Sequence, residues 1–88
     1  MSIEVTYFAQ AAHLIGTEQE SFEAVDLRSL LKAVHARNGT GVESMICSSE
    51  GDPVPWLLID VNGRLVRDPD LPLSPDTRVR LISPISGG

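Results

Sequence analysis

The chain has 88 residues, of which 42% are hydrophobic, so it fits one small domain and excludes a multidomain enzyme. Its formal charge of −5, with no basic stripe, argues against binding to nucleic acid or to anionic lipids, because an acidic surface repels phosphate groups. The longest purely apolar run covers only residues 56–59, whereas a membrane span needs about 20 apolar residues. No transmembrane helix is expected.

The acidic residues are concentrated in the first part of the chain. Residues 1–52 hold eight Asp and Glu against three basic side chains, whereas residues 53–88 hold four of each sign. This excess favours solubility, and a basic protein partner is the alternative interpretation. The first residues lack the basic and apolar regions of a secretory signal, and the lone Cys47 cannot form an internal disulfide. We therefore expect a cytoplasmic location.

Three elements are predicted before the main helix. Alternating apolar residues predict an interior strand over residues 3–8. Residues 9–15 are rich in helix formers and stop at a glycine, which indicates a short helix. Residues 17–25, with Phe22 and Val25 as the main apolar members, predict a second strand at an edge of the sheet.

The main helix is predicted over residues 26–38. Asp26 is a suitable N-cap, and Asn38-Gly39 supplies a left-handed residue that ends a helix. Apolar side chains follow at the i, i+3, i+4, i+7 spacing of one buried stripe: Leu27, Leu30, Leu31 and Val34. The opposite face carries Arg28, Ser29, Lys32 and Ala36. An irregular crossing over residues 39–55 follows, with a short turn near residues 42–46.

The last part of the chain predicts three more strands. Residues 56–61 form the first of them, with Trp56 packed in the core. Asn62-Gly63 is a strong hairpin signal, and residues 64–66 pair back. After a proline-rich loop, residues 78–82 alternate again, so that Val79 and Leu81 face the core.

This order of elements predicts an α+β fold, because the final strand can pair beside the first in a mixed sheet that packs on one main helix. We interpret it as a β-grasp, ubiquitin-like roll. The predicted domain covers residues 1–83, and residues 84–88 form a tail that extends from it.

Side chains that could carry catalysis are few. Cys47 has only His13 and His35 as candidate bases, and nothing in their spacing pairs them, so both histidines are interpreted as structural. One cysteine and two separated histidines do not make a convincing metal site. Gly39-Thr40-Gly41 lacks the third glycine of a dinucleotide fingerprint, and helix termination explains it better.

The C-terminus carries a different kind of chemistry. Gly87 and Gly88 place the terminal carboxylate on a thread without Cβ atoms, slim enough to enter a closed channel in another protein. A terminal glycine pair alone is more often an inert end. The rest of the chain changes that interpretation.

Three segments resemble the MoaD/ThiS family of ubiquitin-like sulfur carriers, most closely the small subunit of molybdopterin synthase. Residues 5–16 resemble its opening strand and its short helix with Phe-Ala-Gln; residues 60–66 resemble its Val-Asn hairpin; residues 73–88 resemble its last strand and tail. The chain departs from the family at residues 74–77, which replace an Asp-Gly-Asp turn, and at Ser83-Pro84, which replaces Pro-Pro.

The resemblance implies a function for the chain end. An E1-like adenylating enzyme would use ATP to form an acyl-adenylate at Gly88, and a persulfide sulfur donor would then displace AMP. The resulting thiocarboxylate would donate sulfur inside a larger synthase subunit. The carrier itself would be non-catalytic and would bind no cofactor or metal, since the ATP belongs to the partner.

The resemblance also assigns roles to residues outside Gly88. Gly87, Ser86, Ile85 and Pro84 would thread and anchor the tail. Phe8, with exposed apolar sheet surface, could join the partner interface. Arg78 and Arg80 alternate with core residues and point outward, so they could meet acidic groups of the adenylating enzyme.

Alternatives remain at the level of the sequence. Residues 47–57 match no single subfamily, so the sulfur could serve thiamine or another metabolite instead of molybdopterin. A ubiquitin-like modifier would join Gly88 to lysines of other proteins. A plain interaction module would leave its Gly-Gly end unmodified.

Overall fold

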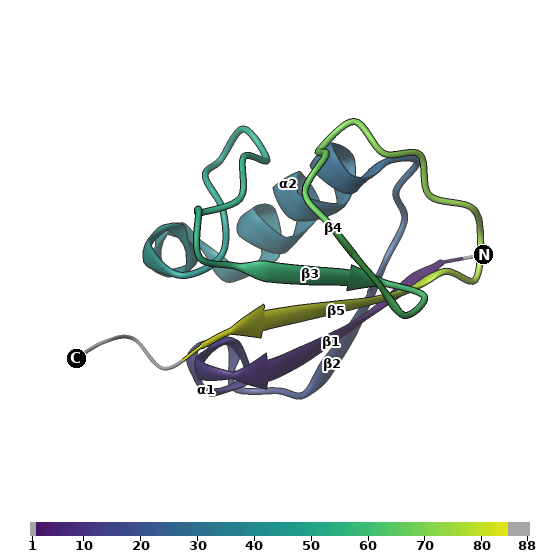
Figure 1. The fold of residues 1–88 in the computed structure, drawn as a ribbon. Coiled ribbons are helices and arrows are strands. Elements are labelled where there is room, and N and C mark those ends of the chain that lie inside the picture. The colour runs from purple at the N-terminus through teal and green to yellow at the C-terminus, as the bar shows by residue number, and fades with distance from the viewer. Residues whose placement is uncertain (1, 85–88) are drawn as a thin grey trace.

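Five strands and one long helix make up most of the structure, a computed structural model that describes residues 2–84. In chain order the elements are β1 (Ile3–Ala9), α1 (Gln10–Ile15), β2 (Gln19–Phe22), α2 (Leu27–Asn38), the 3-10 helix η1 (Thr40–Ser44), β3 (Leu58–Val61), β4 (Arg64–Val66) and β5 (Arg78–Ser83). The strands form one mixed sheet in the order β2-β1-β5-β3-β4. Helix α2 covers one face of this sheet, and the other face is open (Figure 1).

The first and last strands lie side by side in the sheet. β1 is parallel to β5, with Val5 opposite Val79, and both of these strands have antiparallel neighbours on their other side. β1 is therefore interior and β2 is an edge strand, as predicted. The arrangement confirms the α+β, β-grasp roll expected from the sequence.

Strand β1 follows the predicted alternation. Ile3, Val5 and Tyr7 are buried against α2, while Phe8 is exposed. The chain then turns sharply at Ala9, whose φ of 58° and ψ of −130° are unusual for a residue with a Cβ atom. Helix α1 begins at the next residue and ends at Gly16, which has the left-handed φ of 85°.

Helix α2 is fixed at its start by a reciprocal cap. The Ser29 amide donates to Asp26 Oδ1 at 2.7 Å, and the Asp26 amide donates to Ser29 Oγ at 3.2 Å. The predicted stripe is fully buried: Leu27, Leu30, Leu31 and Val34. On the opposite side Lys32 and Ala36 are exposed, whereas Arg28 and Ser29 are half-buried through their contacts. The predicted helix and its register are confirmed.

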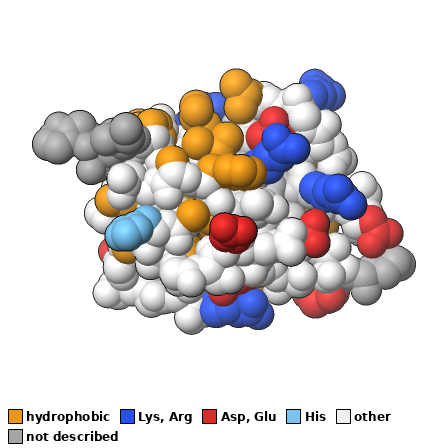
Figure 2. Space-filling view, turned by 90° about the horizontal axis from the view of Figure 1, so that it is seen from below, with side chains coloured by type: hydrophobic (Ala, Val, Ile, Leu, Met, Phe, Trp, Pro, Cys, Tyr) orange, Lys and Arg blue, Asp and Glu red, His pale blue; other side chains and the backbone are white. Residues whose placement is uncertain are grey.

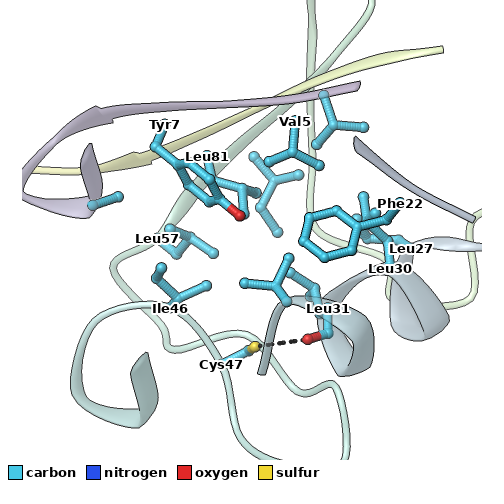
Figure 3. Close-up of a cluster of buried hydrophobic side chains, with 14 of the residues drawn as sticks. Val5, Tyr7, Phe22, Leu27, Leu30, Leu31, Ile46, Cys47, Leu57 and Leu81 are labelled. Carbon is cyan, nitrogen blue, oxygen red and sulfur yellow. Dashed lines mark hydrogen bonds between the residues drawn. The ribbon is translucent and has the colours of Figure 1, made fainter. Parts of the chain in front are cut away.

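The core lies between α2 and the sheet (Figure 3). It is mostly apolar, and at its margin the Tyr7 hydroxyl donates to Glu20 Oε1 at 2.7 Å. Asn38 Nδ2 donates to the same oxygen at 3.2 Å. Because a buried hydroxyl must find a partner, this network allows Tyr7 to fill the core without a loss of hydrogen bonding.

The prediction that Trp56 belongs to the core is wrong. Trp56 is 54% exposed, and strand β3 begins two residues later. The Leu57 amide donates to the Val54 carbonyl at 3.1 Å, which closes a turn with Pro55 and Trp56 at its corners. Leu57 is buried instead, because the turn directs that side chain inward.

The second strand is also shorter than predicted. It ends at Phe22, whose ring is buried, and Val25 is 76% exposed. The Val25 carbonyl accepts a hydrogen bond from the Leu73 amide at 2.9 Å, so this residue belongs to the connection into α2 rather than to the sheet.

The irregular crossing after α2 contains η1 where a short turn is predicted. Its later part packs closely against α2 at Gly51, whose φ is 81°. A Cβ atom at Gly51 would lie 2.6 Å from the Arg28 carbonyl oxygen, so only glycine fits. Arg28 Nη1 donates to Asp52 Oδ1 at 2.6 Å and holds the same loop to the helix.

Candidate functional site

The root of the predicted tail is the end of β5. Ser83 is buried and lies opposite Ala9 of β1, and Pro84 is exposed. The predicted threading and reactive residues, Ile85, Ser86, Gly87 and Gly88, lie outside the described residues. The described part of the site is therefore the surface from which the tail begins.

An apolar row crosses the open face of the sheet close to this root. Phe8 of β1 lies opposite Ile82 of β5, which in turn lies opposite Leu58 of β3. Phe8 is 40% exposed next to the buried Tyr7, and Leu58 is 44% exposed between two buried residues. Figure 2 shows hydrophobic side chains gathered on this face. We call Phe8, Ile82 and Leu58 the apolar row.

Arginines lie on the same face, farther from the end of β5. Arg78 and Arg80 are both exposed, as the alternation predicts. Arg78 Nε lies 3.8 Å from Glu4 Oε1. The Arg80 guanidinium carbon lies 5.9 Å from the centroid of the Phe8 ring, and within residues 2–84 no carboxylate forms an ion pair with it. A cation without an ion-pair partner among the described residues thus borders the apolar row.

The sequence interpretation named Phe8 and both arginines but missed Leu58. The signal was present, since Leu58 lies between the buried Leu57 and Ile59 and must therefore face the other side of the sheet. Because the prediction placed Trp56 in the core, the alternation of the strand put Leu58 on the same, buried side. The structure brings Leu58 next to Ile82, which connects β3 to the surface beside the tail.

Comparison with known proteins identifies the family. The model of the ThiS family matches residues 5–88, nearly the whole chain and its terminal glycines included. The chain belongs to the ThiS family.

Solved structures similar to this ThiS-family chain share its fold. SAMP1 from Haloferax volcanii has 20% identity and a TM-score of 0.83, with 100% of each chain covered. A chain from the complex of subunits 1 and 2 of the molybdopterin-converting factor of Helicobacter pylori 26695 has 24% identity and a TM-score of 0.66, with 100% of each chain covered. Urm1 from Trypanosoma brucei has 17% identity and a TM-score of 0.65, covering 99% of this chain and 95% of that one. No curated protein sequence matches this chain.

Other reactive side chains of the ThiS-family chain do not form a catalytic pair. His35 Nε2 lies 2.7 Å from Glu43 Oε2, which ties α2 to η1, and His13 is exposed on α1. Cys47 is fully buried, and its thiol donates to the Leu31 carbonyl at 3.3 Å (Figure 3). Burial raises the pKa of the Cys47 thiol to about 12. The structure does not bring Cys47 and either histidine together as a nucleophile and base.

Groups of three or more metal-ligating side chains do not occur within residues 2–84. None of the helices in this described part is long and apolar enough to cross a membrane.

Burial raises the pKa of the Tyr7 phenol well above its usual value, and the hydrogen bond to Glu20 adds to the effect. Tyr7 therefore keeps its proton and acts as a donor within the core.

Proposed function

We propose that this chain is a sulfur carrier in which the C-terminal carboxylate of Gly88 becomes a thiocarboxylate that donates sulfur in molybdopterin synthesis. The observation that supports this most is the family match, which extends through the terminal Gly87-Gly88 pair. One structural relative comes from a complex of both subunits of a molybdopterin-converting factor. The larger subunit of such a synthase is the proposed acceptor.

The chemistry requires activation, because a carboxylate is a poor electrophile. In the proposed reaction an E1-like enzyme lets the Gly88 carboxylate attack the α-phosphorus of ATP, which releases pyrophosphate and forms an acyl-adenylate. The terminal sulfur of a persulfide attacks the acyl carbon and expels AMP, which leaves an acyl disulfide. A thiol then attacks the donor's sulfur, so that a new disulfide forms on the donor and the thiocarboxylate is released. ATP is bound by the partner, and the carrier contributes its chain end and no catalytic side chain.

The open face of the sheet is the proposed docking surface for these partners. The apolar row lies where β5 ends, so a protein that binds it can position the tail in its own active site. Phe8 would contribute an aromatic side chain, a type that is enriched at the core of protein interfaces. Pro84, Ile85 and Ser86 would span the distance from this surface to the reacting glycines.

The decisive experiment adds one residue after Gly88. The extended chain should fold normally but should form no thiocarboxylate, because the reacting carboxylate has moved off the glycine. The measurement is intact mass, with the modification located on the C-terminal peptide, after incubation with the adenylating enzyme, ATP and a persulfide donor. Gly87→Val should also fail, because a β-branched side chain stiffens and widens the tail.

Matching thermal melts of the variants and the wild type provide the control for folding. An extended chain that mass analysis shows to be intact, and that is still thiolated at the wild-type rate, would refute the carrier function. The same reaction also tests the second candidate function, that of a ubiquitin-like protein modifier. An isopeptide link from Gly88 to lysines of other proteins, with no free thiocarboxylate, would identify a modifier.

A further inference from the structure

The outer edge of β2 is a second surface of the molecule, separate from the apolar row. The Tyr7 amide donates to the Glu18 carbonyl at 2.9 Å. In an antiparallel ladder every second residue bonds to the same neighbour, so the backbone groups of Glu18, Glu20 and Phe22 bond to β1. By this alternation, Gln19 and Ser21 turn their own N–H and C=O groups away from the sheet. This edge can therefore accept a further strand.

An open groove runs beside this edge, between β2 and α2. It has a volume of about 700 Å³. Its walls include the ring of Phe22 and the small side chains Ala33 and Ala36, which leave room for an apolar side chain. An extended peptide paired with β2 would direct every second side chain into this groove.

Arg37 is the side chain that now lies along the edge. Its Nη1 atom is 3.4 Å from the Ser21 carbonyl oxygen and 4.0 Å from Glu20 Oε2, and its guanidinium carbon lies 4.3 Å from the centroid of the Phe22 ring. Both polar contacts are long, and the side chain is 51% exposed. An incoming strand can displace Arg37 at little cost.

The charged side chains around the groove determine which kind of peptide segment it favours. Glu18 and Glu23 are exposed at the two ends of β2, and Glu20 lies between them on the inner face. Glu23 and Arg37 line the groove itself, and Arg37 is the one cation among its described lining residues, against three carboxylates on or beside β2. A basic segment is favoured by this balance, and an acidic one is repelled.

From these observations we propose that the β2 edge and its groove bind an extended basic segment of a protein partner by strand addition. The groove is at the end of the sheet opposite the root of the tail. Ser21 lies opposite Glu4 of β1, whereas Ser83 lies opposite Ala9, five residues or roughly 17 Å farther along the strand. A partner can therefore bind here while the tail occupies another protein.

The test uses the full chain labelled with ¹⁵N and an acetylated, amidated peptide of alternating lysine and valine, six residues long. We expect saturable amide shifts at Gln19, Ser21 and along Ala33 and Ala36. The matched peptide with glutamate in place of lysine should bind at least about tenfold more weakly, because it loses attraction and gains repulsion. Equal affinity of both peptides would overturn the proposed charge selection.

Three variants test the geometry. Ser21→Pro removes an outward N–H without breaking the ladder to β1, and it should weaken binding about fivefold relative to Ser21→Ala. Arg37→Ala should strengthen binding, because it frees the Ser21 carbonyl and removes a like charge. Thermal melts check the fold of each variant.

Two other results would refute strand addition at β2. One is the absence of shifts at β2 at millimolar peptide; the other is a set of shifts confined to the apolar row. Ser21→Pro should form the thiocarboxylate at the wild-type rate whether or not the peptide binds at β2. The outcome of this test is therefore independent of the proposed sulfur-carrier function.

Discussion

Cys47 shows at the residue scale how the fold controls reactivity. The thiolate, not the thiol, is the nucleophile in sulfur exchange, and complete burial disfavours that charged form. The thiol also donates to the Leu31 carbonyl, which a thiolate cannot do. A protein proposed to carry sulfur at its chain end thus keeps its single thiol out of sulfur chemistry.

The raised pKa of Cys47 predicts a pH dependence of stability. The folded thiol, with a pKa of about 12, holds its proton more tightly than an unfolded thiol does. The contribution of Cys47 to the free energy of unfolding should therefore be constant well below the unfolded pKa of about 8.5, and should fall by about 1–2 kcal/mol between about pH 8 and about pH 10. Chemical denaturation across this range measures the slope.

Cys47→Ala is the matched control for this slope. Its free energy of unfolding at neutral pH should be lower because of the cavity, but its decline between about pH 8 and about pH 10 should be much smaller. The range ends near the ordinary pKa of tyrosine, so that Tyr7 adds little to it. Identical slopes for both proteins would mean that Cys47 is not the cause.

Helix α2 holds the core together at the element scale. Leu31 is fully buried, while Lys32, the next residue, is exposed. Leu31→Ala should lower the free energy of unfolding by about 2–5 kcal/mol, because it removes buried methyl groups and leaves a cavity. Lys32→Ala should change it by less than about 0.5 kcal/mol. Urea denaturation of both variants measures the difference, and equal midpoints would contradict the helical register.

The distribution of charge matters at the scale of the whole molecule. The chain is acidic overall, yet the open face of the sheet carries Arg78 and Arg80 beside the apolar row. A carboxylate from an adenylating enzyme would pair with Arg80, which has no ion-pair partner within residues 2–84. Electrostatic pairing of this kind speeds association and selects partners more than it adds affinity.

The double variant Arg78→Glu with Arg80→Glu tests this docking surface. We expect weaker binding to the adenylating enzyme at low salt, with most of the difference lost at high salt, because salt screens exposed charges. Titration calorimetry at two salt concentrations measures the effect. Arg64→Glu is the control, since Arg64 is exposed on the edge strand β4. An unchanged affinity at low salt would assign both arginines to ordinary solvated positions.

The sequence by itself determined the main helix, the hairpin and the α+β fold. The helix and the hairpin depend on local signals, namely the spacing of Leu27 and Leu31, the cap at Asp26 and the Asn62-Gly63 turn, and the fold class follows from the order of the elements. Each signal acts within a few residues, and no alternative partner along the chain competes with it. The terminal Gly-Gly pair was likewise visible from the sequence, because its chemistry needs no side chain.

Only the tertiary structure decided which exposed residues form a surface. Leu58 and Phe8 are 50 positions apart in the chain, and they become neighbours of Ile82 because β5 lies between β1 and β3. Trp56 was misplaced for the same reason: an apolar residue is buried only if the local turn directs it inward, and here the turn buries Leu57 instead. Composition cannot distinguish these outcomes, since burial depends on strand order and on the direction in which each side chain points.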